Sequence, residues 1–379
     1  MRKENVHRIL KLIALILPVV LLVCLLQSHL FYYSDANTER LRNFYREDSN
    51  SLDVVILGAS EVFFGYSPGH AYENNGYTSY SYAINSNPGI LYEAQLKDIV
   101  RYQDPQIIMV EIWGYLYADE GELYDSAPLQ VYSENTPFSL HKLKAILEHP
   151  YEEKLSCLLP FVRYHKDWSD LENLKYNLEK KMLDNGEPSM LKGIHTITGI
   201  YDPTTDTTLA EEAMGDHLLP EARQSLIGLL EYCRQMNMQN VVFLNFPRYL
   251  TSETDNGLSL RMEEAVGLIH EYGYSFLDLQ AQSDAIGLEG YSDYYDAHHL
   301  NIYGQKKLTE YLGNLLCEQY GLVPIDQNEE NRRHWEECVS YTNAFYDYAQ
   351  GCIENGMKVS IGQEVSLLFR LEELRETAE

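Results

Sequence analysis

The chain has 379 residues, 45% of them apolar, so it is long enough to bury a substantial core and too apolar to be disordered. Its formal net charge at pH 7 is −28. Binding to nucleic acid requires clustered positive charge that displaces counterions from phosphates. The strongly negative net charge therefore argues against nucleic acid as a partner.

The first 34 residues differ from the rest of the chain. Four basic residues lie within the first eleven positions, and residues 12–26 after them are almost all apolar. The length of this stretch, with no small-x-small cleavage site after it, favours a single transmembrane anchor over a cleaved signal peptide, which stays open as the alternative. With the basic flank in the cytoplasm, everything after residue 35 would lie outside the plasma membrane.

Beyond the anchor, alternating apolar runs and amphipathic stretches predict an α/β fold. Residues 35–51 are polar and predict a stalk. Buried strands are predicted at residues 53–57, 79–84, 106–113, 240–245 and 274–279, and helices at residues 89–102, 220–236, 258–272 and 301–320. Together they predict one domain over residues 52–323, built on a doubly wound, parallel, five-stranded sheet.

Two segments interrupt or follow this pattern. Residues 115–216 form a long polar insertion, with a helix predicted near residues 169–183, and a cap over the ligand-binding edge is the expected arrangement. Residues 324–379 are charged, with a helix predicted at residues 335–350 and strand-like alternation at residues 358–361. This tail is expected to be a C-terminal appendage, and its role cannot be read from the sequence.

Ser60 stands at the end of the first predicted strand, after Gly58 and Ala59. In a parallel sheet this is the edge at which ligands bind. A serine hydroxyl becomes a useful nucleophile when a base removes its proton, so Ser60 is a candidate nucleophile only if a base lies nearby. The alternative is a serine that caps the helix after the strand.

A candidate base and acid stand near the end of the domain, in a loop that contains Asp296, His298 and His299. A carboxylate three residues before a histidine can reach back to the imidazole and fix its tautomer. His298 is the rival to His299 as the base. A metal site at this loop is the other alternative, but adjacent histidines point apart, and neither this loop nor the six scattered cysteines supply a further set of ligands. No metal and no cofactor are expected.

With the serine in the first block and Asp-x-x-His-Leu-Asn-x-x-Gly in the last, the chain resembles the SGNH (GDSL-like) hydrolase superfamily over residues 50–320. The similarity is greatest to its membrane-anchored branch, which includes the D-alanyl-teichoic-acid transfer protein and alginate acetylation proteins. The resemblance selects His299 as the base, Asp296 as the acid that orients it and Ser60 as the nucleophile. It implies a flavodoxin-like fold.

The resemblance also implies an oxyanion hole with a second-block glycine and a third-block asparagine. The segment after the second strand offers Gly89, or an amide from Asn85 or Asn87, as the second-block donor. The third block departs from the pattern, because Glu111 stands in the region where the family has its Gly-x-Asn. A carboxylate there would repel an oxyanion if it faced the site.

Two arginines are candidate contacts with substrate. Arg163 lies among aromatic residues of the insertion, and Arg248 follows the fourth predicted strand and so points toward the same edge of the sheet. Arg163 belongs equally to a structural cluster, and Arg248 could simply pair with a neighbouring acid.

The resulting expectation is an acyl esterase or O-acyltransferase of the cell envelope that acts on acylated glycan beside a membrane-bound O-acyltransferase. The alternative is a non-catalytic partner of the same fold that presents glycan to that acyltransferase. A free, secreted esterase is a third possibility, if the N-terminal segment is cleaved. The sequence names neither the acyl group nor the acceptor.

Overall fold

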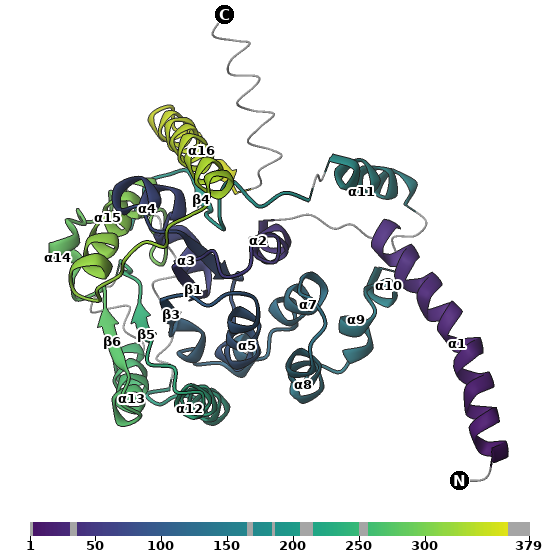
Figure 1. Ribbon diagram of the computed structural model, residues 1–379. Helices are drawn as coiled ribbons and strands as arrows, with labels where there is room; N and C mark the ends of the chain where they lie inside the picture. Colours follow the sequence, from purple (N-terminus) through teal and green to yellow (C-terminus); the bar gives the residue numbers. More distant parts are fainter. Residues whose placement is uncertain are drawn as a thin grey trace, which may run out of the picture. The chain divides into compact units, whose positions relative to one another are not determined.

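The computed structural model describes six stretches of the chain: residues 3–30, 36–164, 170–183, 186–204, 215–249 and 257–362 (Figure 1). They fall into two compact units. The smaller unit joins Met1–Asp35 to Tyr151–Glu187, and the larger unit joins Ala36–Pro150 to Pro188–Glu379. The sheet lies in the larger unit.

Five parallel strands form the main sheet, in the spatial order β2-β1-β3-β5-β6. They are β1 (Val54–Gly58), β2 (Ser79–Ala83), β3 (Ile107–Glu111), β5 (Val241–Asn245) and β6 (Ser275–Asp278). Strands β1, β2, β3 and β5 are buried along their whole length, which is why they read as continuous apolar runs. The predicted five-stranded parallel sheet is confirmed.

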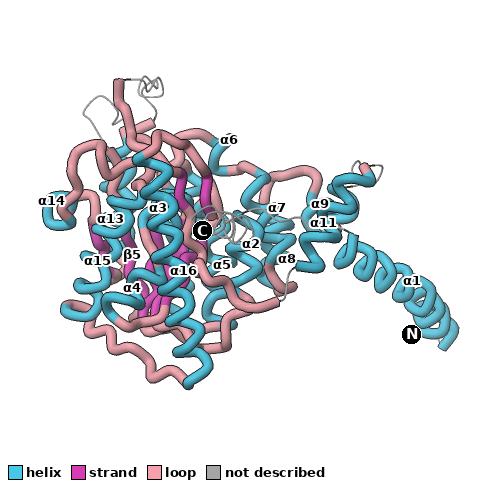
Figure 2. The backbone as a smooth tube through the Cα atoms, turned by 90° about the horizontal axis from the view of Figure 1, so that it is seen from above, coloured by secondary structure: helices cyan, strands magenta, loops and turns pink. Residues whose placement is uncertain are grey.

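Helices cover both faces of the sheet (Figures 1 and 2). One core lies under α5 (Tyr92–Tyr102), α12 (Pro220–Gln235) and α13 (Leu258–Glu271). The other lies under α3 (Ser60–Gly65), α4 (Pro68–Asn75) and α15 (Ile302–Glu318). Short helices η1 (Gly89–Leu91), η2 (Trp113–Tyr115) and α14 (Ser283–Ile286) complete the connections. Successive residues of each strand feed opposite cores, so the sheet is wound on both sides.

The predicted stalk is wrong. Residues Ala36–Phe44 form helix α2, which contacts β2. Leu41 and Phe44, three positions apart and therefore on one helix face, are fully buried. The ring of Phe44 packs edge-on against Tyr80 and Tyr82 of β2. Two apolar residues among many polar ones are enough to dock a short helix, and this density is too low to stand out in a sequence.

The predicted insertion does not form one body. Its first part contains α6 (Glu120–Leu123), α7 (Ser126–Asn135) and α8 (Leu140–Glu148), of which α7 contacts α2 and α8 contacts α5. Residues 151–187 belong to the smaller unit. Residues 188–204 return to the larger unit and contribute β4 (Thr196–Ile197). The first part therefore packs beside helices of the main domain.

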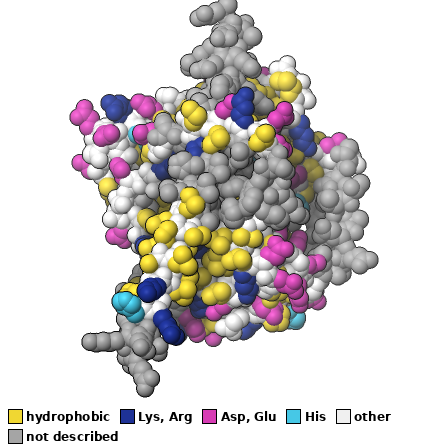
Figure 3. Space-filling model, turned by 90° about the vertical axis from the view of Figure 1, so that its right-hand side faces the viewer, with side chains coloured by type: hydrophobic (Ala, Val, Ile, Leu, Met, Phe, Trp, Pro, Cys, Tyr) yellow, Lys and Arg dark blue, Asp and Glu magenta, His cyan; other side chains and the backbone are white. Residues whose placement is uncertain are grey.

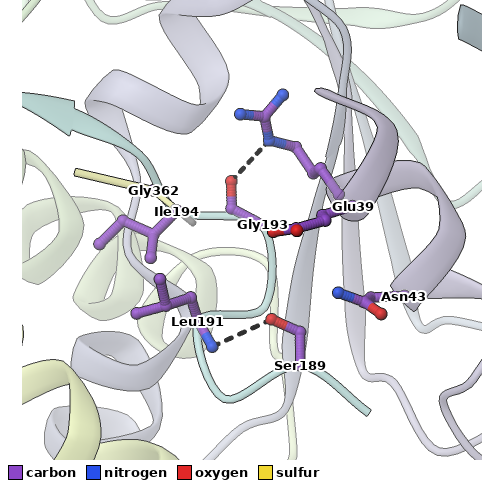
Figure 4. Close-up of a pocket in the computed structure, with 8 residues that line it drawn as sticks. Glu39, Asn43, Ser189, Leu191, Gly193, Ile194 and Gly362 are labelled. Atoms are coloured by element: carbon purple, nitrogen blue, oxygen red, sulfur yellow. Dashed lines mark hydrogen bonds between the residues drawn. The ribbon is translucent and has the colours of Figure 1, made fainter. Parts of the chain in front are cut away.

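The returning segment packs on α2 around a small pocket (Figure 4). The Arg40 guanidinium, through its Nε, donates to the carbonyl of Gly193 at 2.9 Å and, through a second nitrogen, to that of Ala83 at 3.1 Å. Ser189 Oγ accepts from the amide of Leu191 at 3.1 Å. The two bonds of Arg40 join the segment to the end of β2.

The C-terminal residues are part of the larger unit rather than an appendage. Helix α16 (Glu329–Glu354) packs on α4 and α15, and β7 (Ser360–Ile361) pairs antiparallel with β4. Trp335 is fully buried and its ring stacks on Tyr72 of α4. Lys192 of the returning segment, also fully buried, binds Glu47 at 2.7 Å and His334 of α16 at 2.9 Å. This buried charge cluster ties three distant parts of the chain together.

The smaller unit contains α1 (Lys3–Leu30), α9 (Lys154–Leu158), α10 (Pro160–Arg163) and α11 (Leu171–Leu183). Many exposed apolar side chains of the described residues belong to α1, from Leu10 to Leu22. Figure 3 shows apolar side chains gathered on the face that it presents. Among the residues that the structure describes, no helix has the length and apolar character that crossing a membrane requires. This finding goes against the transmembrane anchor predicted in residues 1–34.

Candidate active site

Ser60 lies where β1 passes into α3, at the carboxyl edge of the sheet. Strand β1 ends at Gly58, Ala59 is extended, and Ser60 begins the helix with 8% of its surface exposed. The turn requires glycine before it, because a Cβ at Gly58 would lie 2.5 Å from the side chain of Val62 and 2.6 Å from that of Glu111. Close packing beneath the turn thus holds the serine in place at the carboxyl edge of the sheet.

The second part of the site is the loop between Tyr294 and Leu300, which are joined by an antiparallel bridge. Asn301 closes this loop and caps α15: its Oδ1 accepts from the amides of Tyr303 and Gly304, and its Nδ2 donates to three carbonyls. Gly304 is needed here, because a Cβ would lie 2.4 Å from the carbonyl oxygen of Asp293. The Leu-Asn-x-x-Gly part of the motif is therefore structural.

The loop brings Asp296 and His299 to Ser60. His299 Nε2 lies 2.8 Å from Ser60 Oγ, and His299 Nδ1 lies 2.9 Å from both carboxylate oxygens of Asp296. With its Nδ1 proton donated to Asp296, His299 presents the lone pair of Nε2 to the serine hydroxyl. His298, the rival base, is exposed, and its Nδ1 faces Arg248. The structure thus brings together the three residues of the predicted triad.

Asp296 is built to stay ionised. Burial raises the pKa of its carboxyl, but the hydrogen bond and charge of His299 and the amide of His298 outweigh burial and bring the pKa below its ordinary value. The amides of His298 and His299 both donate to Oδ1 at 2.8 Å. The ring of Phe64 packs 4.6 Å from that of His299 and restricts its position. A fixed, ionised carboxylate would stabilise an imidazolium formed at His299.

Glu111 is turned away from the site, beneath the nucleophile turn. It is buried and accepts hydrogen bonds from the amides of Ala59, at 3.3 Å, and Trp113. Burial raises the pKa of this carboxyl to about 8, although both amides act in the opposite direction. Glu111 therefore supports the residue before Ser60, and its raised pKa favours the uncharged form at neutral pH, which would not repel an oxyanion.

The three residues predicted as oxyanion donors have other contacts. The buried Asn87 side chain donates to the carbonyl of Gly58 at 3.0 Å and to Gln95 at 2.9 Å. The Asn85 amide donates to Asn37 of α2 at 3.0 Å. Gly89 is buried against the ring of Tyr115. These contacts shape the loop after β2, and the donor for an oxyanion stays a prediction.

The two predicted substrate-binding arginines lie in different units. Arg163 belongs to the smaller unit, where its guanidinium lies over the ring of Tyr164. Arg248 belongs to the larger unit, where it is 5% exposed and forms an ion pair with Glu61. Its pairing with an acid was the alternative left open by the sequence. Contact of either arginine with substrate stays a prediction.

The roles of two residues at the site were missed in the sequence. Glu61 follows Ser60 directly and is 4% exposed, but its partner Arg248 stands far away in the chain. Asn301 was visible only as part of a motif, and its five hydrogen bonds follow from a loop geometry that the sequence does not state. An acidic residue inside an apolar segment is the one clue to a buried ion pair.

Replacing Asn301 with alanine is expected to lower the free energy of unfolding by about 2 kcal/mol, because the cap is lost and buried carbonyls lose their donor. Urea denaturation measures this change. Asn328→Ala is the matched control, because Asn328 caps α16 with a side chain that accepts from Asn331 at the exposed start of that helix. Asn328→Ala is expected to cost less stability. An equal loss of stability in the two variants would contradict the role of Asn301 in holding the loop before α15.

Among the described residues, no group of three or more histidine, cysteine, aspartate or glutamate side chains is arranged to hold a metal ion.

The comparisons found no matching family model and no match among curated proteins. One similar solved structure is that of a protein from Parabacteroides merdae proposed to be a GDSL-like lipase. It has 12% identity and a TM-score of 0.34, over 73% of this chain and 99% of that one. A likeness this weak supports no conclusion about function, which must come from the site.

Proposed function

We propose that this protein transfers or hydrolyses acyl groups through an ester on Ser60, as an acyl esterase or O-acyltransferase of the SGNH (GDSL-like) type. One observation carries the proposal: an unbroken chain of hydrogen bonds runs from Ser60 Oγ through the His299 imidazole to Asp296. Ser60, from the start of the domain's sequence, meets Asp296 and His299, from near its end, in the geometry that serine activation requires.

In the first half-reaction, Ser60 Oγ attacks the carbonyl carbon of an acyl ester while His299 Nε2 takes the hydroxyl proton. Asp296 stabilises the imidazolium. Collapse of the tetrahedral intermediate breaks the bond to the leaving oxygen, which receives the proton from His299, and leaves the acyl group on Ser60. In the second half, His299 deprotonates water or an acceptor hydroxyl, which takes the acyl group, and the proton then passes from His299 to the released Ser60 Oγ. Water gives an esterase, and a sugar hydroxyl gives a transferase.

The substrate class rests on the sequence resemblance alone. The membrane-anchored SGNH branch points to acylated glycans of the cell envelope as substrate and to a membrane-bound O-acyltransferase as partner. A location outside the plasma membrane belongs to the same proposal. Neither the acyl group nor the direction of transfer follows from the site.

Covalent labelling tests the proposal directly. The full-length protein is incubated with a fluorophosphonate probe and, separately, with p-nitrophenyl acetate, beside the Ser60→Ala variant. We expect labelling and turnover in the unaltered protein and neither in Ser60→Ala, because the probe reacts with an activated serine. Ser67→Ala is the control, since Ser67 is a buried serine that begins the next helix, α4. Equal labelling in Ser60→Ala, or no labelling of a folded protein even with a candidate acyltransferase partner, would refute the proposal.

A further inference from the structure

A buried ion pair lies directly beside the proposed nucleophile. Glu61, the residue after Ser60, is 4% exposed and Arg248 is 5% exposed, and their side chains are in contact. Both charges are removed from water here, and the free-energy cost of removing them can exceed what their mutual attraction contributes. One use of a buried ion pair is to fix a geometry or a charge, and the contacts of this pair bear on both.

The carboxylate of Glu61 is a competitor of His299. Its Oε2 lies 3.4 Å from Ser60 Oγ, whereas His299 Nε2 lies 2.8 Å from the same atom. The serine has one proton to donate. A bare carboxylate would attract this proton and repel the negative charge that develops on the substrate oxygen. A cation bound to Glu61 weakens both effects.

Arg248 supplies that cation and extends it to the other half of the site. Its Nη1 lies 2.8 Å from His298 Nδ1, the residue before the proposed base, and its backbone amide donates to Gln280 at 2.6 Å. The guanidinium also lies over the ring of Trp113. One rigid, planar group therefore joins the turn that carries Ser60 to the loop that carries His299.

We propose that Arg248 is a positioning residue for the triad: paired with Glu61 and bonded to His298, it holds the nucleophile turn against the catalytic loop and neutralises the carboxylate beside Ser60. This inference rests on the proposed function. It replaces the contact between Arg248 and substrate that the sequence suggested with a role inside the protein.

Four proteins test the proposal: the unaltered chain, Arg248→Lys, Arg248→Met and the double variant Glu61→Gln/Arg248→Met. The readouts are the rate of fluorophosphonate labelling and kcat and KM for p-nitrophenyl acetate, with Ser60→Ala as background. Arg248→Met leaves Glu61 charged and unpaired, so we expect kcat to fall by about 100-fold with KM little changed. The double variant removes both charges and should recover about tenfold of this loss. Arg248→Lys keeps the cation and should be faster than the double variant.

This rank order separates the proposal from a purely structural role. A merely structural Arg248 would leave the double variant no faster than Arg248→Met, and that result would overturn the inference, as would a normal rate in Arg248→Met. Should Arg248→Met fail to fold, an Arg248→Lys variant no faster than the double variant would overturn it. If the unaltered protein is not labelled, the proposed function fails as well. If it is labelled and the order fails, this inference alone is wrong.

Discussion

Replacing His299 with alanine is expected to lower kcat/KM for an acyl ester by about 10⁴-fold, because Ser60 then has no base to take its proton. Asp296→Asn should cost nearly as much, since an amide cannot hold His299 with its proton on Nδ1. The double variant Asp296→Asn/His299→Ala should lose no more than His299→Ala alone, because the two residues act through one imidazole. Steady-state kinetics with p-nitrophenyl acetate measure all three.

Two histidines serve as controls for this prediction. His270, an exposed residue at the end of α13, should tolerate alanine with no loss of turnover. His298→Ala should lose far less than His299→Ala, since His298 contacts Arg248 rather than Ser60. A larger loss in His298→Ala would mean that the base has been assigned to the wrong histidine, and additive losses in the double variant would mean that Asp296 and His299 do not work together.

Replacing Glu111 with glutamine is expected to remove a large part of the pH dependence of stability. In the unfolded chain this carboxyl has a pKa near 4.5, and burial raises its pKa to about 8 in the folded state. Between these values the folded state binds more protons than the unfolded state, so the free energy of unfolding falls as pH rises. The shift corresponds to a loss on the order of 4 kcal/mol across this range. Glutamine does not titrate in this range, so the free energy of unfolding of the Glu111→Gln variant should change less with pH.

Urea denaturation between about pH 5 and pH 8 measures the slope of the free energy of unfolding against pH. Glutamine can also change the stability by an amount that is the same at every pH, and this change does not affect the slope. The difference between the two profiles isolates Glu111 from other groups, such as His195, whose pKa burial lowers to about 3. Glu148→Gln, at an exposed carboxylate of α8, should reproduce the slope of the unaltered protein. Parallel profiles for Glu111→Gln and the unaltered protein would show that Glu111 is ionised throughout.

The sequence predicted what depends on local patterns. The buried strands were visible because both faces of the sheet are covered, so residues such as those of Val54–Gly58 and Val241–Asn245 form continuous apolar runs. Ser60, Asp296 and His299 could be proposed because two short motifs fall at the same edge of a parallel sheet. The distances that join them follow from the fold.

The remaining features depend on contacts between distant residues. Leu41 and Phe44 dock α2 through two side chains in a polar helix, too few to form the apolar stripe from which docking is usually predicted. Helix α16 does carry such a stripe, since Trp335, Cys338, Phe345 and Ala349 are buried along one face, but the helices α4 and α15 on which it packs are distant in the sequence. The pairing of Glu61 with Arg248 and the turn of Glu111 away from the site are decided by burial, which a single sequence does not specify.

The most direct test of the account is to find the acyl group. The full-length protein is mixed with p-nitrophenyl acetate, quenched in acid and digested, and the peptide that contains Ser60 is measured by mass spectrometry, in parallel with Ser60→Ala. We predict one acetyl group on Ser60, more abundant early in the reaction than at its end. Turnover with the acetyl group on another residue, or with no covalent intermediate on Ser60 at any time, would contradict the proposed mechanism.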